Sequence, residues 1–513
     1  MGDYNTLGRK RSTLQNAVSM ILYQVLTILL GFIIPRLLLQ TYGPELHGYT
    51  STVTTIISYV ELLSLGLSTT AIQALYQPLA EHDDAKLSQI LNAVDRFYMR
   101  VGALYAGAVV LCAAALPLVI HAAIPTAQIV SLMLVTGATS TLECFVYSKH
   151  RVLLQADQRL FVVTTADLIA LALRGALQIM LMLQDCSVVL VQGIPAVMVL
   201  LRMAMLARYV PRHYRGLDPK QPPDFSALSK RRSVFAHQVA GLVSNNTDVV
   251  ILSVFGTMTQ VSIFSVYNLI FSHLYTLITN VFSYGVLASF GQVIAEKNRD
   301  VLLHAYEKYE FTYYMFVTVV YSATAILILP FVGLYTQGVE GVVYEDRWLA
   351  VLFTAVGIAT NLRIPCNTLI TAAGHFGETA WRAILEAAIN LTVSLALYPR
   401  LGVYGLLLGT LASFLYRTTD TIRYSHKYIL RAPCGASLFR LIRVLALLAL
   451  HLWLFQAVLP LQIETWHGWL IAAVTVTAAV TATTLLTNFL CERRLMREVC
   501  RYLFAFGRGR RRN

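Results

Sequence analysis

The chain alternates long apolar stretches with short polar segments from one end to the other. A helix that crosses the hydrocarbon core of a bilayer needs about 20 predominantly apolar residues. A window of that length predicts an all-α polytopic membrane protein with fourteen transmembrane helices. They are expected at residues 14–39, 47–76, 97–120, 126–148, 160–183, 186–208, 233–255, 259–294, 310–335, 347–372, 379–398, 402–424, 438–460 and 466–490. The span at 259–294 is too long for one straight crossing and is expected to tilt or to continue beyond the bilayer.

The apolar pattern repeats itself along the chain. Leu116-Pro117-Leu118-Val119 matches Leu329-Pro330-Phe331-Val332, and Tyr98 matches Tyr313 at almost the same separation in the sequence. This recurrence predicts two pseudo-symmetric six-helix lobes with a cleft between them, as in transporters built from parallel repeats. The expected domains are an N-lobe at 1–208, a cytoplasmic linker at 209–232, a C-lobe at 233–424, two further helices at 425–490 and a basic cytoplasmic tail at 491–513.

The composition agrees with the span pattern and excludes soluble proteins. Hydrophobic residues make up 57% of the chain and charged residues 13%. Soluble domains have about 45–50% apolar and about 25% charged residues. The sequence is therefore neither a cytosolic enzyme nor a secreted or disordered protein.

Lys and Arg are distributed unevenly between the polar segments. With the N-terminus inside, the inner segments hold 33 of the 40 Lys and Arg residues, and the outer loops hold only Arg347 and Arg400. Because cytoplasmic loops are rich in Lys and Arg, we expect both termini in the cytoplasm. The same bias accounts for the net charge of +13, and no nucleic-acid partner is expected.

Two arginines lie in the middle of predicted spans, Arg174 in 160–183 and Arg363 in 347–372. An ionisable residue at that depth marks a functional site by default; the alternative is a structural ion pair, for example with Asp167 or Glu386. Arg36 lies near the outer end of the first span, where its side chain either has a function or reaches to the interface. Arg202 and Arg382 lie near inner ends and are expected to do the latter.

Acidic and amide residues also fall inside spans. Glu61 is central in the span 47–76 and is either a proton or cation coupling site or a salt-bridge partner. Asn245 and Asp248 share one helix face with Gln238 and Gly241. That face is expected to line a wet cleft or to contact a partner helix.

Three segments resemble one protein family. Arg36 is followed by Gly43-Pro44-Glu45, by Gly48-Tyr49 and by Leu65-Gly66-Leu67; the other two segments are 245–256 and Leu153 to Gln158. They resemble the polysaccharide-transport (oligosaccharide flippase) branch of the multidrug/oligosaccharidyl-lipid/polysaccharide exporter superfamily, over roughly residues 10–425.

The resemblance implies a bacterial inner-membrane flippase for lipid-linked oligosaccharide units on undecaprenyl pyrophosphate, acting by alternating access. The expected partners are this substrate, membrane lipids, a coupling cation or proton, and a polysaccharide polymerase with glycosyltransferases. In that interpretation Arg174, Arg363, Arg36, Asn245 and Asp248 contact the substrate, and Glu61, Asp167 and Glu386 serve coupling or ion pairing.

Two alternatives remain open, a cation-coupled multidrug efflux antiporter and a lipid II flippase. Lipid II flippases carry several basic residues in the first two spans, whereas this chain has only Arg36 there. The sequence contains no nucleotide-binding or metal-binding motif, so we expect no cofactor and no metal. The outer loops are too short for the domain of a membrane glycosyltransferase or polymerase, and the protein is not expected to be an enzyme.

Overall fold

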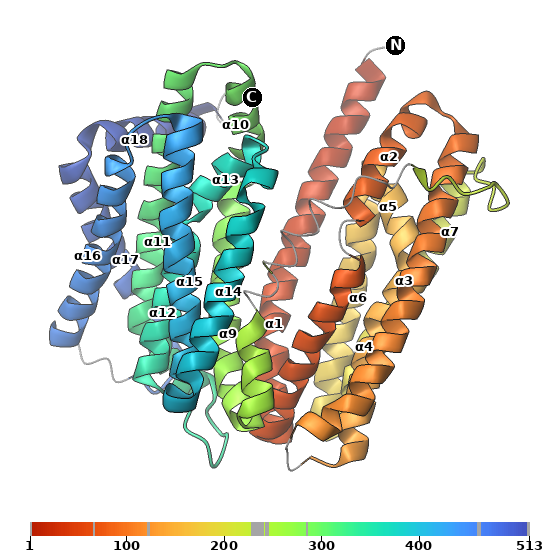
Figure 1. The fold of residues 1–513 in the computed structure, drawn as a ribbon, viewed down its shortest axis with the longest axis horizontal. Coiled ribbons are helices and arrows are strands. Elements are labelled where there is room, and N and C mark those ends of the chain that lie inside the picture. Colours follow the sequence, from red (N-terminus) through yellow and green to blue (C-terminus); the bar gives the residue numbers. More distant parts are fainter. Residues whose placement is uncertain are drawn as a thin grey trace. The chain divides into compact units, whose positions relative to one another are not determined.

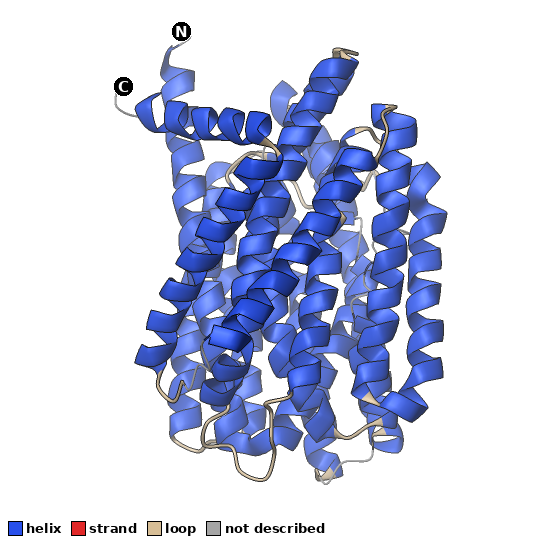
Figure 2. Cartoon of the chain, turned by 90° about the vertical axis from the view of Figure 1, so that its left-hand side faces the viewer, coloured by secondary structure: helices blue, strands red, loops and turns tan. Residues whose placement is uncertain are grey.

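The structure, a computed structural model, describes residues 3–64, 67–120, 124–226, 241, 246–283, 286–458 and 463–509. These residues form helices joined by turns and loops, with no strand among them (Figure 1, Figure 2). The helices are α1 (Asp3–Val60), α2 (Leu67–Glu81), α3 (Asp84–Val119), α4 (Thr126–Leu142), α5 (Ser148–Ala156), α6 (Leu160–Leu183), α7 (Val188–His213), α9 (Met258–Ser283), α10 (Val286–Ala295), α11 (Arg299–Tyr335), α12 (Arg347–Leu362), α13 (Ile364–Ala372), α14 (Phe376–Leu401), α15 (Val403–Tyr424), α16 (Gly435–Val458), α17 (Trp466–Cys491) and α18 (Arg493–Gly509).

Eleven helices in the described part of the chain are long and apolar enough to cross a membrane. The helix α1 accounts for two predicted crossings, because its apolar part has 43 residues, about 65 Å at 1.5 Å per residue. The helix α15 is long enough but carries Arg417, Asp420 and Arg423. The span predicted at 233–255 is described only at residue 241 and in the helix Asn246–Phe255. The predicted fold class is therefore confirmed.

The two crossings within α1 meet at Gly43. Its backbone leaves the helical conformation there, with φ 81° and ψ 174°, a region that glycine adopts without the steric cost of a Cβ. Pro44 follows, and its fixed φ suits the first residue of a new helix. The turn between the first two spans therefore depends on this Gly-Pro pair.

One span that the sequence predicts as continuous changes its helix type. The span at 47–76 becomes a short 3-10 helix at Glu61–Ser64, and α2 is described from Leu67. In the span at 259–294 the structure describes α9 to Ser283 and α10 from Val286, and residues 284 and 285 lie outside the described part.

The chain divides into two compact units, Met1–Ser265 with Gly338–Glu340, and Val266–Gln337 with Gly341–Asn513. In the first unit, α6 packs against α1 and α7, and α4 packs against α3 and α7. Its main apolar core includes Leu75, Val94, Tyr147, Leu153 and Leu206. This packing fixes the rotation of α6 and α7, which carry Asp167, Arg174 and Arg202.

In the second unit, α15 packs against α14 and α12, and α11 packs against α12, α16 and α17. Close helix approach depends on small residues, as is usual in membranes. A Cβ on Gly405 would lie 2.7 Å from the backbone carbonyl carbon of Leu397, and one on Gly409 would lie 2.2 Å from Ser394 Oγ. The helices α14 and α15 are thereby held in backbone contact.

The helix order of the first half recurs in the second half with the spacing that the sequence predicts. The helices α3, α6 and α7 begin at Asp84, Leu160 and Val188, and α11, α14 and α15 begin at Arg299, Phe376 and Val403, an almost constant distance further along the chain. Left-handed turn residues recur in the same way: His82 and Lys297, Gln158 and Gly374, Asp185 and Gly402. The agreement of turns as well as helices supports an internal repeat.

Candidate functional site

Arg174 lies in the middle of α6 and is held by one hydrogen bond. Its Nε donates to Gln178 Oε1 at 3.0 Å, and Gln178 Nε2 donates to the Val191 carbonyl on α7 at 3.0 Å. Gln178 is completely buried. The two Nη atoms of Arg174 make no hydrogen bond or ion pair with any residue that the structure describes. Four N–H donors of a guanidinium therefore remain for a ligand.

The surroundings of Arg174 come from α1 and α7. The neighbouring Gly175 lets α1 approach closely, since a Cβ there would lie 2.5 Å from Leu30 Cδ1. Tyr23 of α1 and Glu143 are near enough to interact electrostatically with the guanidinium, and so is Arg202. Arg174 thus lies where three helices and two other charged residues converge.

Arg202 of α7 is the second cation of this cluster, and both its partners are acidic. It forms an ion pair with Glu143, at the start of the π-helical segment Glu143–Tyr147, and another with Asp167 of α6 at 3.2 Å. Tyr147 donates to Asp167 at 2.6 Å. The prediction that the Arg202 side chain reaches to the membrane interface is therefore wrong. Asp167 pairs with Arg202 and not with Arg174.

Glu61 lies at the interruption of the second span, where it is the first residue of the 3-10 helix. Ser140 Oγ of α4 donates to its Oε1 at 3.0 Å. The carboxylate thus contacts α4 at the point where the helix changes its hydrogen-bonding pattern. Arg36 lies in α1, seven residues before Gly43, and is half-buried.

Arg363 connects α12 to α13 and belongs to a chain of alternating charges in the second unit. It pairs with Glu386 of α14, whose other oxygen lies 3.5 Å from Arg417 Nε of α15. Arg417 also lies 3.4 Å from Asp420, and Asp420 pairs with Arg382 of α14. Three arginines and two carboxylates leave a surplus of one positive charge. Arg382 is thus paired inside the helix bundle rather than at the interface.

The polar face predicted around Asn245 is described only in part. Asn245 and Gln238 lie outside the described residues. Asp248 is described in the helix Asn246–Phe255 and is 6% exposed. In the next turn of that helix, Ser253 Oγ is 2.7 Å from Thr52 Oγ1 of α1. This part of the helix therefore faces α1 rather than lipid.

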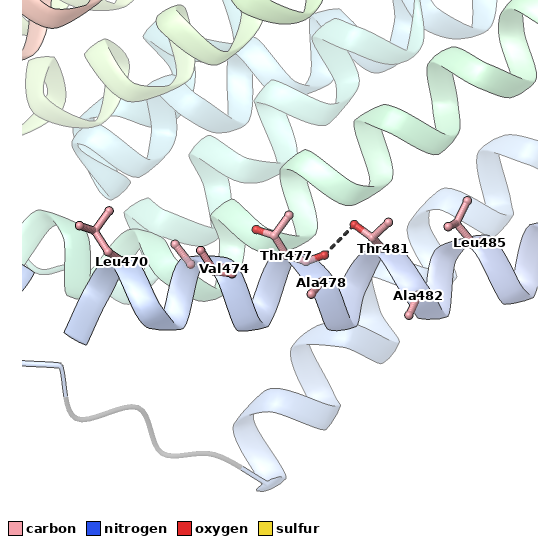
Figure 3. A pocket seen from close by; sticks show the side chains of 8 residues that line it. Leu470, Val474, Thr477, Ala478, Thr481, Ala482 and Leu485 are labelled. Atoms are coloured by element: carbon pink, nitrogen blue, oxygen red, sulfur yellow. Dashed lines mark hydrogen bonds between the residues drawn. The ribbon is translucent and has the colours of Figure 1, made fainter. Parts of the chain in front are cut away.

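Two further features of the described residues bear on the choice of ligand, the absence of a metal cluster and an uncharged groove. No group of three or more His, Cys, Asp or Glu side chains suited to a metal ion occurs among them. A groove along α17 has a volume of about 710 Å³ and is lined by the uncharged residues Leu470, Ala473, Val474, Thr477, Ala478, Thr481, Ala482 and Leu485. Figure 3 shows the side chains that line it. An apolar lining of this kind suits hydrocarbon and not a charged head group.

Comparison with known proteins identifies the fold. No protein-family model and no curated protein matches the sequence, but solved structures do. The chain matches an inward-facing multidrug resistance MATE family transporter of the MOP superfamily with a TM-score of 0.63 and 12% identity, covering 84% of this chain and 98% of that one. The fold is that of the MATE transporters.

Two further structures give the same result. A mutant of the Vibrio cholerae MATE transporter VcmN matches with a TM-score of 0.56 and 15% identity, covering 83% of this chain and 98% of that one. The eukaryotic MATE transporter AtDTX14 matches with a TM-score of 0.53 and 14% identity, covering 85% and 99%. The MATE-like fold therefore extends over most of the chain.

Several residues of these charge clusters escaped the sequence analysis. Gln178 was missed although it follows Arg174 by one helical turn, the spacing of neighbours on one helix face. Arg417 was not singled out as a site residue although it lies in the predicted span 402–424; it is 6% exposed and contacts Glu386 of α14. The signal for Arg417 was available in the sequence, because Arg202 occupies the equivalent position of the first repeat.

Proposed function

We propose that the protein is a flippase that moves lipid-linked oligosaccharide units across the cytoplasmic membrane by alternating access, for cell-surface polysaccharide synthesis. The cargo would be carried on undecaprenyl pyrophosphate, and glycosyltransferases and a polymerase would act before and after it. The MATE-type fold supports membrane transport, and a transporter needs no catalytic group. The choice of an anionic cargo depends on the cations inside the spans.

The observation that carries this choice is the free end of Arg174. Its Nη atoms have no partner among the described residues, and an uncompensated charge at membrane depth is costly. A pyrophosphate supplies paired oxygens at the spacing of the guanidinium fork, and such charge-assisted bonds are among the strongest in proteins. A cationic drug would instead be repelled from this end of the side chain.

A second candidate function is cation-coupled drug efflux. It is favoured by the carboxylates of the first unit, Glu61, Glu143 and Asp167, and by the multidrug transporters among the structural matches. We assign Glu61 to proton or cation coupling in either case, because it lies where the second span is interrupted. A lipid II flippase is the third candidate, and the absence of Lys and Arg from the predicted span 47–76 argues against it.

The proposal is tested with variants of Arg174 in proteoliposomes. The probe is an undecaprenyl pyrophosphate-linked oligosaccharide with a fluorophore on the sugar, and its crossing is followed by quenching with an impermeant reductant. Loss of hydrogen bonds to a charged group worth about 1.5–3 kcal/mol corresponds to roughly a tenfold to hundredfold lower rate. We expect that loss for R174A and a smaller one for R174K, which keeps the charge without the fork.

Arg212 provides the matched control, since it is an exposed arginine at the end of α7. R212A is expected to transport the probe at the wild-type rate. Equal rates for R174A and R212A would overturn the assignment of Arg174 to the cargo. Faster movement of ethidium than of the anionic probe by the wild-type protein would favour efflux instead.

A further inference from the structure

The C-terminal helix α18 lies across the ends of the spanning helices of the second unit (Figure 2). It begins at Arg493, and only Glu492 separates it from Cys491, the last residue of α17. With 26 residues, α17 is about 39 Å long and exceeds the hydrocarbon core of about 30 Å. The start of α18 is therefore at the level of the lipid head groups.

The apolar face of α18 is occupied by the protein itself. Leu495, Met496 and Val499 are buried against Phe311 and Met315 of α11. These residues are consequently not available to insert into the hydrocarbon, as a membrane-inserted amphipathic helix would require. In the part of α18 whose side chains are described, 493–501, contact with lipid therefore falls to the polar face.

Glu498 fixes α18 to α11 from the polar side. It pairs with Lys308 at 2.8 Å and with His304 at 2.9 Å. The hydrogen bond from Lys308 is the main cause that lowers the pKa of the Glu498 carboxyl to about 2. Glu498 therefore stays ionised near neutral pH, and its charge is already balanced by α11.

The remaining polar face of α18 is a row of exposed guanidinium groups, Arg493, Arg494, Arg497 and Arg501. Arg494 Nε lies 3.3 Å from Glu498, a carboxylate that Lys308 and His304 also share, whereas Arg497 and Arg501 make no hydrogen bond or ion pair with any residue in the described part of the chain. The other nearby carboxylate, Glu492, is bound by Arg440 at 2.7 Å and by Arg443 at 2.6 Å. The row therefore has a surplus of positive charge that α18 does not neutralise.

A buried donor without a partner lies beside this row. Arg443 of α16 is 8% exposed, and its Nη2 binds Glu492, the residue before α18. Its Nη1 is buried and has no hydrogen-bond partner among the described residues. The Phe311 and Phe439 rings, each with its centroid 5.6 Å from Arg443 Cζ, are only weak acceptors. Because buried polar groups are almost always satisfied, this N–H group is suited to a stronger acceptor.

We propose that Arg493, Arg494, Arg497 and Arg501, together with Arg443 Nη1, bind the phosphate groups of anionic lipids at the leaflet where α17 ends. Because α18 begins at the depth of the lipid head groups, these donors lie close to lipid phosphates. Guanidinium groups bind phosphate oxygens in pairs, and clusters of basic residues next to spanning helices attract anionic lipids. This site is separate from Arg174 and does not depend on the transported cargo.

The test compares an anionic with a zwitterionic lipid, using the full-length protein in an uncharged detergent. Phosphatidylglycerol and phosphatidylcholine with identical acyl chains are titrated while thermal unfolding is followed, and lipid retention is read by native mass spectrometry. We expect phosphatidylglycerol to be retained and to raise the unfolding midpoint, and phosphatidylcholine to do neither. Glycerol 3-phosphate serves as the soluble oxyanion and is expected to have no effect at the same concentration.

Two variants localise the effect. The quadruple variant R493Q, R494Q, R497Q and R501Q is expected to weaken phosphatidylglycerol binding more than tenfold, and R443K a few fold. The control R208Q, R212Q, R215Q and K220Q removes the same number of exposed cations from the first unit and is expected to bind as the wild type does.

Each contrary outcome overturns the proposal. Equal retention of the two lipids by the wild-type protein would show that no anionic site exists, whether or not the variants fold. Equal weakening in the quadruple variant and its control would show that general charge, and not α18, attracts the lipid. An equal shift with glycerol 3-phosphate would assign the surface to soluble oxyanions.

Discussion

Gln178 determines which part of Arg174 is available to a ligand. One end of its amide accepts from Arg174 Nε and the other donates to the Val191 carbonyl. Because the side chain is fully buried and bonded at both ends, it holds the plane of the guanidinium. Gln178 is thus a positioning residue for the proposed pyrophosphate contact.

Q178E tests this role at nearly constant shape. The carboxylate would pair with Arg174 and neutralise it, so we expect transport of the polyprenyl pyrophosphate probe to fall roughly tenfold or more. The second carboxylate oxygen cannot donate to the Val191 carbonyl as Gln178 Nε2 does, so the unfolding temperature is measured alongside and transport is compared at a temperature where the variant is folded. Wild-type transport by Q178E would show that the charge of Arg174 does not act on the cargo.

Glu386 is the central anion of the charge chain in the second unit. It is 6% exposed and faces both Arg363 and Arg417. Removing one partner of a buried pair costs about 3–5 kcal/mol. We expect E386Q to lower the free energy of unfolding by that amount in a denaturant titration.

E378Q is the matched control, since Glu378 lies exposed in the first turn of the same helix. It is expected to change the free energy of unfolding by less than about 1 kcal/mol. Equal effects of the two substitutions would mean that the charge chain does not stabilise the fold.

For single residues, the sequence identified the charged side chains inside the spans but not the ion pairs that they form. Arg174 and Arg363 are recognisable because charge is rare in apolar spans. Asp167 and Arg174 are two helical turns apart, about 10 Å along α6, and only the packing of α7 shows that Asp167 binds Arg202 instead. Such pairing depends on the rotation of neighbouring helices, which a single span does not encode.

Among the elements, the hairpin of α14 and α15 depends most visibly on small residues. Gly405 lies against the backbone of Leu397 and Tyr398, where no side chain can be accommodated. The main chain cannot move aside as a flexible side chain does, so the two helices must separate if a methyl group is added.

G405A is therefore expected to destabilise the protein by about 1–3 kcal/mol, the usual cost of overpacking. G377A in α14 is the control, because no atom lies within 4 Å of its added Cβ and alanine favours helix. The measurement is the free energy of unfolding in detergent. A loss no larger for G405A than for G377A would contradict close packing of α14 and α15.

Span positions followed from hydrophobic length alone, whereas the interruptions did not. The helix α17 begins and ends where the apolar run predicts. The span at 47–76 reads as continuous because its 3-10 segment at Glu61–Ser64 lies between apolar residues. Hydropathy records solvent preference and not helix continuity, so Glu61 could be placed in a span but not at the end of a helix.

For the whole molecule, the distribution of Lys and Arg predicts an even number of spans and both termini in the cytoplasm. Cysteines offer a direct check, since Cys186 lies between α6 and α7, on the outside in this topology, and Cys434 lies in a basic inner segment. We expect an impermeant maleimide added to intact cells to label Cys186 and not Cys434, with C186A as the unlabelled control. Labelling of Cys434 from outside would reverse the orientation.

The central claim is that the cargo is an anionic polyprenyl-linked sugar. The most direct measurement gives one preparation of wild-type proteoliposomes two cargoes, the fluorescent undecaprenyl pyrophosphate oligosaccharide and ethidium, with and without a proton or sodium gradient. The account predicts that the oligosaccharide probe crosses and that ethidium does not. Transport of ethidium with no movement of the oligosaccharide probe would contradict it.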